Sequence, residues 1–325
     1  MHAEECEASF SSHFPCLPEG FNKALSFDRG ERGAYLKKRL FLWRAEGDLL
    51  SPAIVQKEDA SSQNWEVVSL EDRYQFGGSF AGGYHFAHGD WRAGLQYTYF
   101  GSRTSSPGTE ISSSEGEIVP LWAADQRAGG PYFSEEARWT LYRHLIDLDL
   151  SRRYYVGQLL AVSAQVGLRA ILFSQKYQAE YGNATTSLTT QTQTDSWSLG
   201  PRLQLSSSWF IGSGLELFFD IASTLSYVDC DAHHQEEDPL GSYELQLNAK
   251  DVRVCPTQEM SAGIGWGASF LRHAFHLHVT LEYTLEALYG QNVLRSFLEP
   301  IVVNFSRGSD DLTLQGFTLS VRSDF

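Results

Sequence analysis

Apolar and polar side chains alternate with a period of two along much of this chain. Between positions 91 and 99, Trp91, Ala93, Leu95, Tyr97 and Tyr99 occupy one parity, opposite Arg92, Gly94, Gln96 and Thr98. Residues 275–285 and 312–325 repeat the pattern. Because successive side chains of a β-strand point to opposite faces, these segments are predicted to be strands with one apolar and one polar face.

The same template predicts ten strands. They fall near residues 38–47, 75–86, 91–102, 138–153, 158–180, 195–208, 214–229, 255–271, 275–289 and 311–325. Four short connections alternate with five long ones, which lie near 48–74, 103–137, 181–194, 230–254 and 290–310. Short periplasmic turns that alternate with long extracellular loops are typical of outer-membrane barrels, whereas the connections of a soluble β-sandwich have no reason to alternate.

The predicted fold is therefore all-β, a single transmembrane, antiparallel, up-and-down β-barrel of about ten strands in the bacterial outer membrane. Two further segments, 65–70 and 300–305, leave a count of twelve open. An even number of strands places both chain ends on the periplasmic side. Several strands exceed the ~9–11 residues that cross a bilayer, so we expect them to project beyond it.

The two faces of these strands have different predicted environments. In hydrocarbon every backbone N–H and C=O must be paired within the protein, so a sheet spans a membrane only if it closes on itself. The apolar parity is therefore predicted to face lipid and the polar parity the lumen. Aromatic residues near the strand ends are expected to form the two interfacial girdles. They are Trp91, Tyr97, Tyr99, Trp139, Tyr154, Tyr155, Trp197, Trp209, Tyr227 and Tyr289.

The polar parity carries charges of both signs. The predicted pore-lining residues are Arg92, Asp147, Asp149, Arg169, Arg202, Glu216, Asp220, His276, His278, Glu282, Glu286 and Arg322. Such a mixture either hydrates an aqueous path or neutralises itself into a packed polar core, because a narrow barrel is just wide enough for side chains to fill. We predict a porin-like pore for passive diffusion of small hydrophilic solutes or ions. The alternative is a structural or adhesive surface barrel without an open channel.

Composition and charge exclude further classes of protein. The 325 residues include 25 Lys and Arg against 40 Asp and Glu, a formal net charge of −15 that argues against nucleic acid as a partner. No run approaches the ~18 consecutive apolar residues of a transmembrane helix. The first residues lack the basic and apolar regions of a secretory signal, so we expect the signal peptide to have been removed. Residues 1–34 show no sustained period and are predicted to be a periplasmic extension or a plug, followed by the barrel over 35–325.

The four cysteines are disulfide candidates that fall into two local pairs, Cys6 with Cys16 and Cys230 with Cys255. Disulfides persist in oxidising compartments such as the periplasm and the cell surface. Four cysteines allow three connectivities. His276 and His278 share a polar face, but a metal site needs three or four ligands, so neither a metal nor a cofactor is predicted.

The best enzymatic candidate lies in residues 229–234, where Asp231 precedes His233 by two positions. A carboxylate so placed can orient an imidazole that activates water. The pair slightly resembles the Asp–His pair of omptin proteases, which are also ten-stranded barrels. Those enzymes need an acidic pair in an earlier loop as well, and residues 102–136 contain no closely spaced Asp pair. An omptin-like outer-membrane protease is thus a second alternative, and the chain is expected not to be an enzyme.

A set of segments resembles, in order and spacing, the Legionella outer-membrane protein family, which is similar to the chlamydial major outer membrane protein. The segments are 40–45, 76–84, 90–99, 145–150, 167–170, 200–202 and 312–325. The resemblance implies a pore-forming outer-membrane protein that is cross-linked into the envelope through cysteines and has no catalytic residues. The chain departs from the pattern of this family in residues 1–34 and in the loops.

The last segment is the predicted assembly signal. It carries Phe317, Leu319, Val321 and Phe325 on its apolar parity and ends on the aromatic carboxy-terminus. Its expected partner is the barrel-assembly machinery. The other expected partners are outer-membrane lipid, lipopolysaccharide and small hydrophilic solutes. Whether the chain forms a homo-oligomer is left open.

Overall fold

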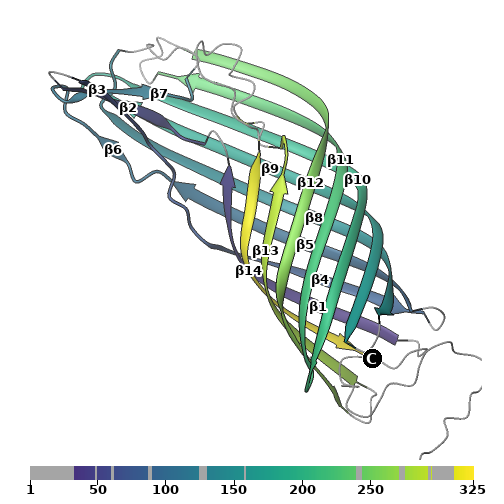
Figure 1. Ribbon diagram of the computed structural model, residues 1–325. Coiled ribbons are helices and arrows are strands. Elements are labelled where there is room, and N and C mark those ends of the chain that lie inside the picture. Colours follow the sequence, from purple (N-terminus) through teal and green to yellow (C-terminus); the bar gives the residue numbers. More distant parts are fainter. Residues whose placement is uncertain are drawn as a thin grey trace, which may run out of the picture.

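A computed structural model of the chain contains ten antiparallel strands that close into a barrel (Figure 1). The strands are β1 (Gly33–Gly47), β4 (Gln75–His85), β5 (Trp91–Ser105), β8 (Ser134–Val156), β9 (Leu160–Gly182), β10 (Ser187–Gly212), β11 (Leu215–Glu237), β12 (Glu244–Phe270), β13 (Phe275–Leu288) and β14 (Leu312–Asp324). Each pairs with the next, and β14 pairs with β1 to close the ring. The structure describes residues 33–47, 50–59, 62–86, 90–123, 130–156, 159–238, 244–270, 275–291, 294 and 311–325.

The connections divide the barrel into two ends. Tight connections such as Ser213–Gly214 between β10 and β11 lie at one end, which we call the short-turn end. The carboxy-terminus lies there too, and backbone hydrogen bonds between Ala34 and Phe325, of 2.9 and 3.1 Å, seal the ring (Figure 1). We call the opposite end the long-loop end. Among the described residues, no helix is long and apolar enough to cross a membrane.

The predicted ring of ten strands is confirmed, and the largest differences in length lie at the long-loop end. β10 begins at 187 instead of 195, β11 ends at 237 instead of 229, and β12 begins at 244 instead of 255. The Thr/Ser/Gln stretch and the acidic segment, both predicted to be loops, therefore continue the strands. Thr192 pairs with His234, and Asp231 with Lys250. Beyond the membrane the outward face meets water, so its residues are polar and the apolar alternation disappears while backbone pairing continues.

A separate three-stranded sheet lies at the long-loop end (Figure 1). It consists of β2 (Ala53–Asp59), β3 (Ser62–Val67) and β7 (Gly116–Pro120), and a two-residue strand, β6 (Thr109–Glu110), pairs with β8. The segment 65–70, considered as an extra barrel strand, thus contributes to β3 outside the ring. The segment 300–305 and residues 1–32 lie outside the described residues. The barrel begins two residues before the predicted boundary at 35.

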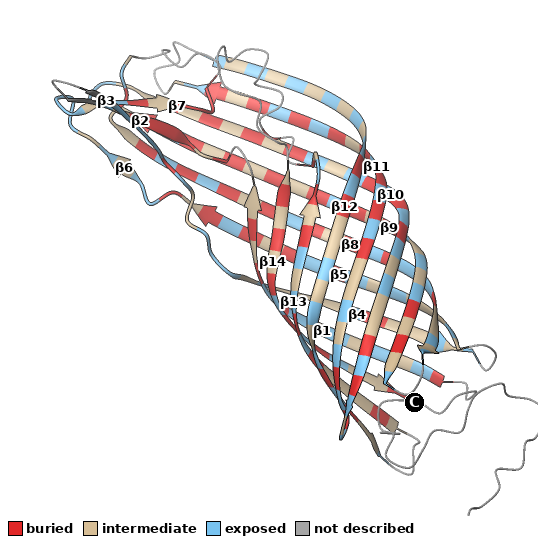
Figure 2. Ribbon diagram, viewed as in Figure 1, coloured by how far each residue is buried: buried red, intermediate tan, exposed pale blue. Residues whose placement is uncertain are grey.

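Burial alternates along the strands, so that each strand has an exposed and a buried face (Figure 2). Trp197 and Trp209 are exposed on the outer face of β10, twelve positions apart. At ~3.3 Å per residue and a tilt of ~40°, this separation corresponds to about 30 Å across a membrane. Eight of the ten predicted girdle aromatics are exposed. The assignment of Trp139 and Tyr155 was wrong, because their odd positions in β8 place them on the inner face.

Candidate functional site

The inner wall of the barrel carries all twelve residues predicted to line a pore. Each occupies the inward parity of its strand and is buried or half-buried. Eleven of them line one cavity of about 240 Å³, and His276 lines a neighbouring cavity of about 60 Å³. Whether this wall conducts solutes stays a prediction.

Sequence reasoning missed other charged residues of the same wall. They are Lys37, Arg39, Arg143, Arg153, Glu259 and Asp324. Parity alone identifies most of them: Arg143 and Arg153 share the parity of Asp147 in β8. Lys37 was missed because β1 begins five residues before its predicted start.

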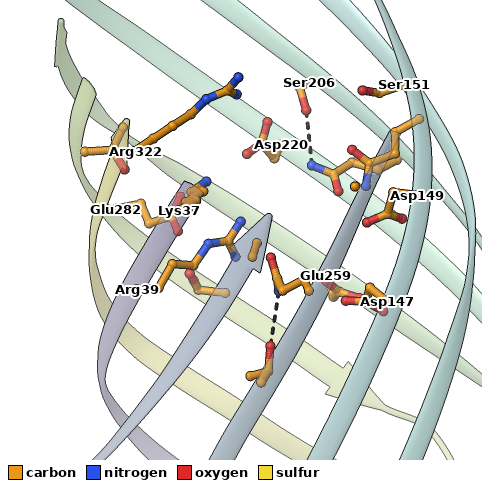
Figure 3. A pocket seen from close by; sticks show the side chains of 18 of the residues that line it. Lys37, Arg39, Asp147, Asp149, Ser151, Ser206, Asp220, Glu259, Glu282 and Arg322 are labelled. Atoms are coloured by element: carbon orange, nitrogen blue, oxygen red, sulfur yellow. Dashed lines mark hydrogen bonds between the residues drawn. The ribbon is translucent and has the colours of Figure 1, made fainter. Parts of the chain in front are cut away.

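The two cavities form one polar region toward the short-turn end. They share Arg92, Arg153, Glu216, His278 and Arg322 in their walls. Figure 3 shows Lys37 and Arg39 of β1, Asp220 of β11 and Glu282 of β13 extending into the larger cavity. The lumen is therefore not filled by side chains in this half of the barrel.

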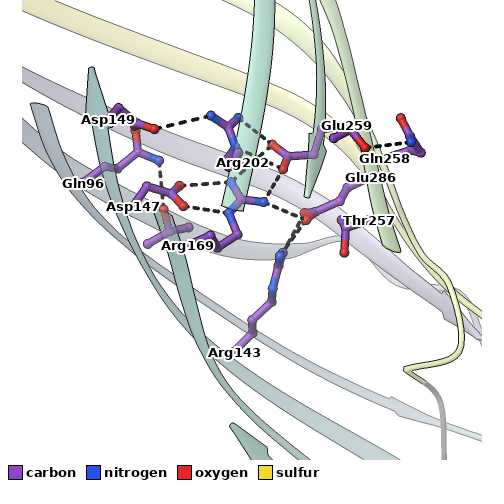
Figure 4. Close-up of polar contacts among 12 residues, drawn as sticks. Gln96, Arg143, Asp147, Asp149, Arg169, Arg202, Thr257, Gln258, Glu259 and Glu286 are labelled. Carbon is purple, nitrogen blue, oxygen red and sulfur yellow. Dashed lines mark hydrogen bonds and ion pairs between the residues drawn. The ribbon is translucent and has the colours of Figure 1, made fainter. Parts of the chain in front are cut away.

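An ionic network crosses the lumen and lines this cavity on the side of the long-loop end (Figure 4). Arg143 of β8 donates two hydrogen bonds, of 2.6 and 2.5 Å, to the carboxylate of Glu286 on β13. These two strands lie five places apart in either direction around the ring of ten. A single ion pair thus joins opposite walls of the barrel.

Two further arginines complete the network. Arg169 donates to Asp147 at 2.7 and 3.0 Å and also to Glu259. Arg202 donates to Glu259 at 3.0 Å and lies 3.8 Å from Asp149. Bidentate arginine–carboxylate pairs are strong and directional, and a buried charge without its partner is costly. The network therefore links five strands across the lumen.

Aromatic packing fills the lumen beyond the network, toward the long-loop end. We call residues 50–55 and 118–123 the plug. Its Trp122 is fully buried and stacks on Tyr177 of the barrel wall, with ring centroids 3.8 Å apart. The buried aromatic side chains of this half are Phe41, Trp43, Phe100, Trp122, Tyr132, Trp139, Phe173, Tyr177 and Tyr181.

Hydrogen bonds fix the plug to the wall. Tyr177 donates through its hydroxyl to the carbonyl of Leu50 at 3.0 Å, and Tyr181 donates to that of Pro52 at 2.7 Å. Within the plug, Trp122 donates through its indole N–H to the carbonyl of Ser51 at 3.0 Å. Backbone carbonyls of a loop are thereby satisfied inside an apolar environment, which is a requirement for burying a loop. The plug is an ordered, packed part of the molecule.

The histidines at the short-turn end hold carboxylates. The carboxylate of Asp324 lies 3.2 Å from His85 and 3.5 Å from His276, and it accepts a hydrogen bond from Arg322 at 3.0 Å. His278 lies 2.9 Å from Glu216 instead. His276 and His278 thus contact different carboxylates.

The proposed Asp–His pair lies on the outer face of β11, where both side chains are exposed. The ring of His233 lies 2.6 Å from the side-chain oxygen of Asn248, and Asp231 lies 3.8 Å from Lys250. Each side chain therefore contacts β12. Proteolysis stays an untested alternative.

The predicted pairing of Cys230 with Cys255 is not formed. Cys230 faces Asp251 across the sheet and Cys255 faces Ser226, so the two cysteines are offset by four residues. The thiol of Cys230 contacts the carbonyl of Asp231, and that of Cys255 contacts the carbonyl of Gly290. Sequence spacing could not reveal this register. Cys6 and Cys16 lie outside the described residues.

The predicted assembly segment forms the outer face of β14. Phe317, Leu319, Val321 and Phe325 are all exposed there, 40–50% of each side chain being accessible. This is the face that a membrane would cover. Its recognition by assembly machinery stays a prediction.

A closed ring of strands with an exposed apolar belt and a polar lumen defines an integral outer-membrane β-barrel. The chain belongs to the Legionella outer-membrane protein family: residues 39–325 match the family described as Legionella pneumophila major outer membrane protein precursor. No curated protein is similar enough in sequence to count as a relative.

Three solved structures match this chain over most of their length at low sequence identity. The outer membrane protease OmpT from Escherichia coli has 12% identity and a TM-score of 0.35, over 93% of this chain and 98% of that one. The toluene transporter TodX of P. putida has 11% identity and a TM-score of 0.36, over 95% and 92%. A major outer membrane protein from Thermus thermophilus has 13% identity and a TM-score of 0.34, over 90% and 99%.

Proposed function

We propose that the protein is an outer-membrane channel for small hydrophilic solutes or ions whose resting state is closed at the long-loop end. The short-turn end, with the carboxy-terminus and the start of β1, faces the periplasm, and the long loops face the exterior. In this arrangement the polar cavity communicates with the periplasm. The plug and the ionic network separate it from the exterior.

The observation that carries this proposal is the charged cavity below the network. A barrel with a purely structural role has no need for open space, because side chains can fill a narrow lumen. Here about 240 Å³ stays open within a wall of charged and hydroxyl side chains. Among the described residues, the cross-lumen pair of Arg143 with Glu286 and the plug stand between this space and the long-loop end.

Planar-bilayer recording tests the proposal. We expect the refolded protein to show small, infrequent conductance steps, and a variant with Arg143→Gln, Glu286→Gln and Trp122→Ala to stay open longer with a larger step. The matched control replaces the exposed pair on the outer face of β8, Arg138→Gln with Glu136→Gln, and should behave as the parent protein. Absence of discrete conductance in every variant, with the barrel shown to be folded, would refute a channel.

A sealed structural or adhesive barrel is the second candidate. The pair of Arg143 with Glu286 favours it, because a link between opposite walls stabilises the closed state. This candidate expects no conductance from the opened triple variant either. It also expects cells to lose surface attachment when the sheet of β2, β3 and β7 is deleted.

We also propose that the protein is not an enzyme. The exposed contacts of Asp231 and His233 with β12 support this view. Loss of proteolytic activity in an Asp231→Ala or His233→Ala variant of a folded preparation would contradict it.

A further inference from the structure

The lumen cavity has a charge balance opposite to that of the whole chain. The chain has a formal net charge of −15. The walls of the larger cavity contain eight basic and seven acidic side chains. The basic ones are Lys37, Arg39, Arg92, Arg143, Arg153, Arg169, Arg202 and Arg322, and the acidic ones are Asp147, Asp149, Glu216, Asp220, Glu259, Glu282 and Glu286.

Most of these charges neutralise one another. The three arginines of the network share its four carboxylates, Arg322 pairs with Asp324, and Glu216 pairs with His278. The basic side chains that have no carboxylate within 4.0 Å among the described residues are Lys37, Arg39, Arg92 and Arg153. The acidic ones that have no basic group within 4.0 Å there are Asp220 and Glu282. Four unpaired basic side chains thus face two unpaired acidic ones, while the network holds one carboxylate more than it has arginines.

The fold gathers the four unpaired cations on one arc of the wall. The four cations come from β1, β5 and β8, and β4 lies between β1 and β5 in the ring. The β4 residues beside Lys37 and Arg39 are Ala81 and Ser79, which are too small to occupy the space in front of them. Figure 3 shows Lys37 and Arg39 reaching from β1 into the cavity. The Nε of Arg39 is buried and has no hydrogen-bond partner among the described residues.

Lys37, Arg39, Arg92 and Arg153 are half-buried. Cations that are partly removed from water without counter-charges are unfavourable, and an anion between them offsets that cost. Guanidinium groups match the oxygens of phosphates and carboxylates with two parallel hydrogen bonds, and an ammonium adds a point charge. We propose that the lumen cavity binds one small oxyanion, a phosphate- or carboxylate-bearing solute, through Lys37 and Arg39, with Arg92 and Arg153 on its short-turn side. Glu282 of β13 and Asp220 of β11 lie on the other flank of β1 and confine the anion to the arc from β1 to β8.

The anion site extends the proposed channel function by naming a class of solute. Only the biological role of the site rests on that function. Binding is an equilibrium property that does not require conduction. Calorimetry of the folded barrel in detergent therefore tests the site, whereas bilayer recording tests the channel. A barrel that binds anions but never conducts would refute the channel alone.

The experiment is isothermal titration of the refolded full chain with inorganic phosphate at low ionic strength, repeated with acetate. We expect one bound anion per chain and a loss of affinity of about tenfold, or about 1.4 kcal/mol, for Lys37→Gln or Arg39→Gln. The matched control is Lys38→Gln, since Lys38 is the next residue of β1 and lies on the exposed outer face. It should bind as the parent protein does. Asp220→Asn, which removes an opposing charge, should tighten binding.

Three outcomes would overturn the proposal. They are no binding of either anion by the parent protein, equal loss of affinity in Lys37→Gln and Lys38→Gln, and binding of glycine in place of phosphate and acetate. Phosphate binding without acetate binding would assign the site to phosphate-bearing solutes, and the reverse to carboxylates. Resistance of the barrel to unfolding in cold SDS checks that every variant is folded. Because Arg39→Gln removes an unpaired, half-buried charge, this variant is expected to fold.

Discussion

The two halves of the lumen have the same wall of strands but different contents. In the long-loop half, Trp43, Trp139 and Tyr177 point inward and pack against the plug. In the short-turn half, the same strands present Arg39, Asp149 and Arg169, and space remains between them. The inner face of one β-strand thus changes from protein core to solvated cavity within a few residues. Ring closure defines the lumen, but its side chains decide whether a region supports packing or solute binding.

Substitutions in the ionic network, at the boundary between the halves, should have the largest effect on the free energy of unfolding. Removing Glu286 as Glu286→Ala leaves Arg143 buried without its bidentate partner, which we expect to cost about 3–5 kcal/mol in the free energy of unfolding. The double change with Arg143→Ala should cost less than the sum of the single changes. Urea unfolding of the barrel in lipid vesicles measures both. If the single changes simply add, the pair is not coupled.

The plug of the long-loop half comes next. Trp122→Ala removes a fully buried ring that stacks on Tyr177, and we expect a loss of about 3 kcal/mol, confined to the plug and the sheet of β2, β3 and β7. Limited proteolysis should cut within residues 106–133 while the barrel stays intact. Trp65→Ala is the control, because Trp65 in β3 is 52% exposed and its loss should change stability by no more than about 0.5 kcal/mol. Equal protease sensitivity of both variants would contradict a packed plug.

Sequence reasoning predicted the walls better than the contents of the lumen. Parity placed Arg169 and Glu286 on the inner face, because that depends only on local alternation. The pairing of Arg143 with Glu286 depends on ring closure, which brings together residues 143 positions apart. The plug was not predicted because its loops carry no periodic signal. Trp139 was assigned to the lipid girdle from its place near a strand end, although its parity with Asp147 identified it as an inward residue.

Overpacking the short-turn half should lower the free energy of unfolding by less than removing a buried ring from the long-loop half. A Cβ at Gly83 would collide with the carbonyl oxygen of Ala93 and with the ring of Tyr35, so Gly83→Ala should cost about 2 kcal/mol. Gly82→Ala is the neighbouring control, since its Cβ would lie 3.5 Å from Leu36 in ordinary contact. The ring of Tyr35 lies under Arg322, with 4.3 Å between the guanidinium carbon and the ring centroid. Unfolding midpoints of the two variants should therefore differ, and identical midpoints would show that Tyr35 moves aside freely.

The smallest expected effect is a pH dependence of local stability in the long-loop half. It concerns the carboxylate of Glu135, which does not belong to the ionic network. Glu135 lies beyond the aromatic girdle, and burial raises the pKa of its carboxyl above the usual range. The folded chain then retains a proton that the unfolded chain has lost, so stability is highest below the ordinary glutamate pKa and declines as pH rises through the raised value. Hydrogen exchange of β6 and its partner segment of β8 should accordingly be slower near pH 4 than at pH 7, after correction for the intrinsic pH dependence of exchange. Glu135→Gln, which mimics the protonated form, should remove this difference, whereas Glu136→Gln on the exposed face should preserve it. An unchanged pH dependence in Glu135→Gln would assign the effect to another group and leave the network as the site where buried charge matters.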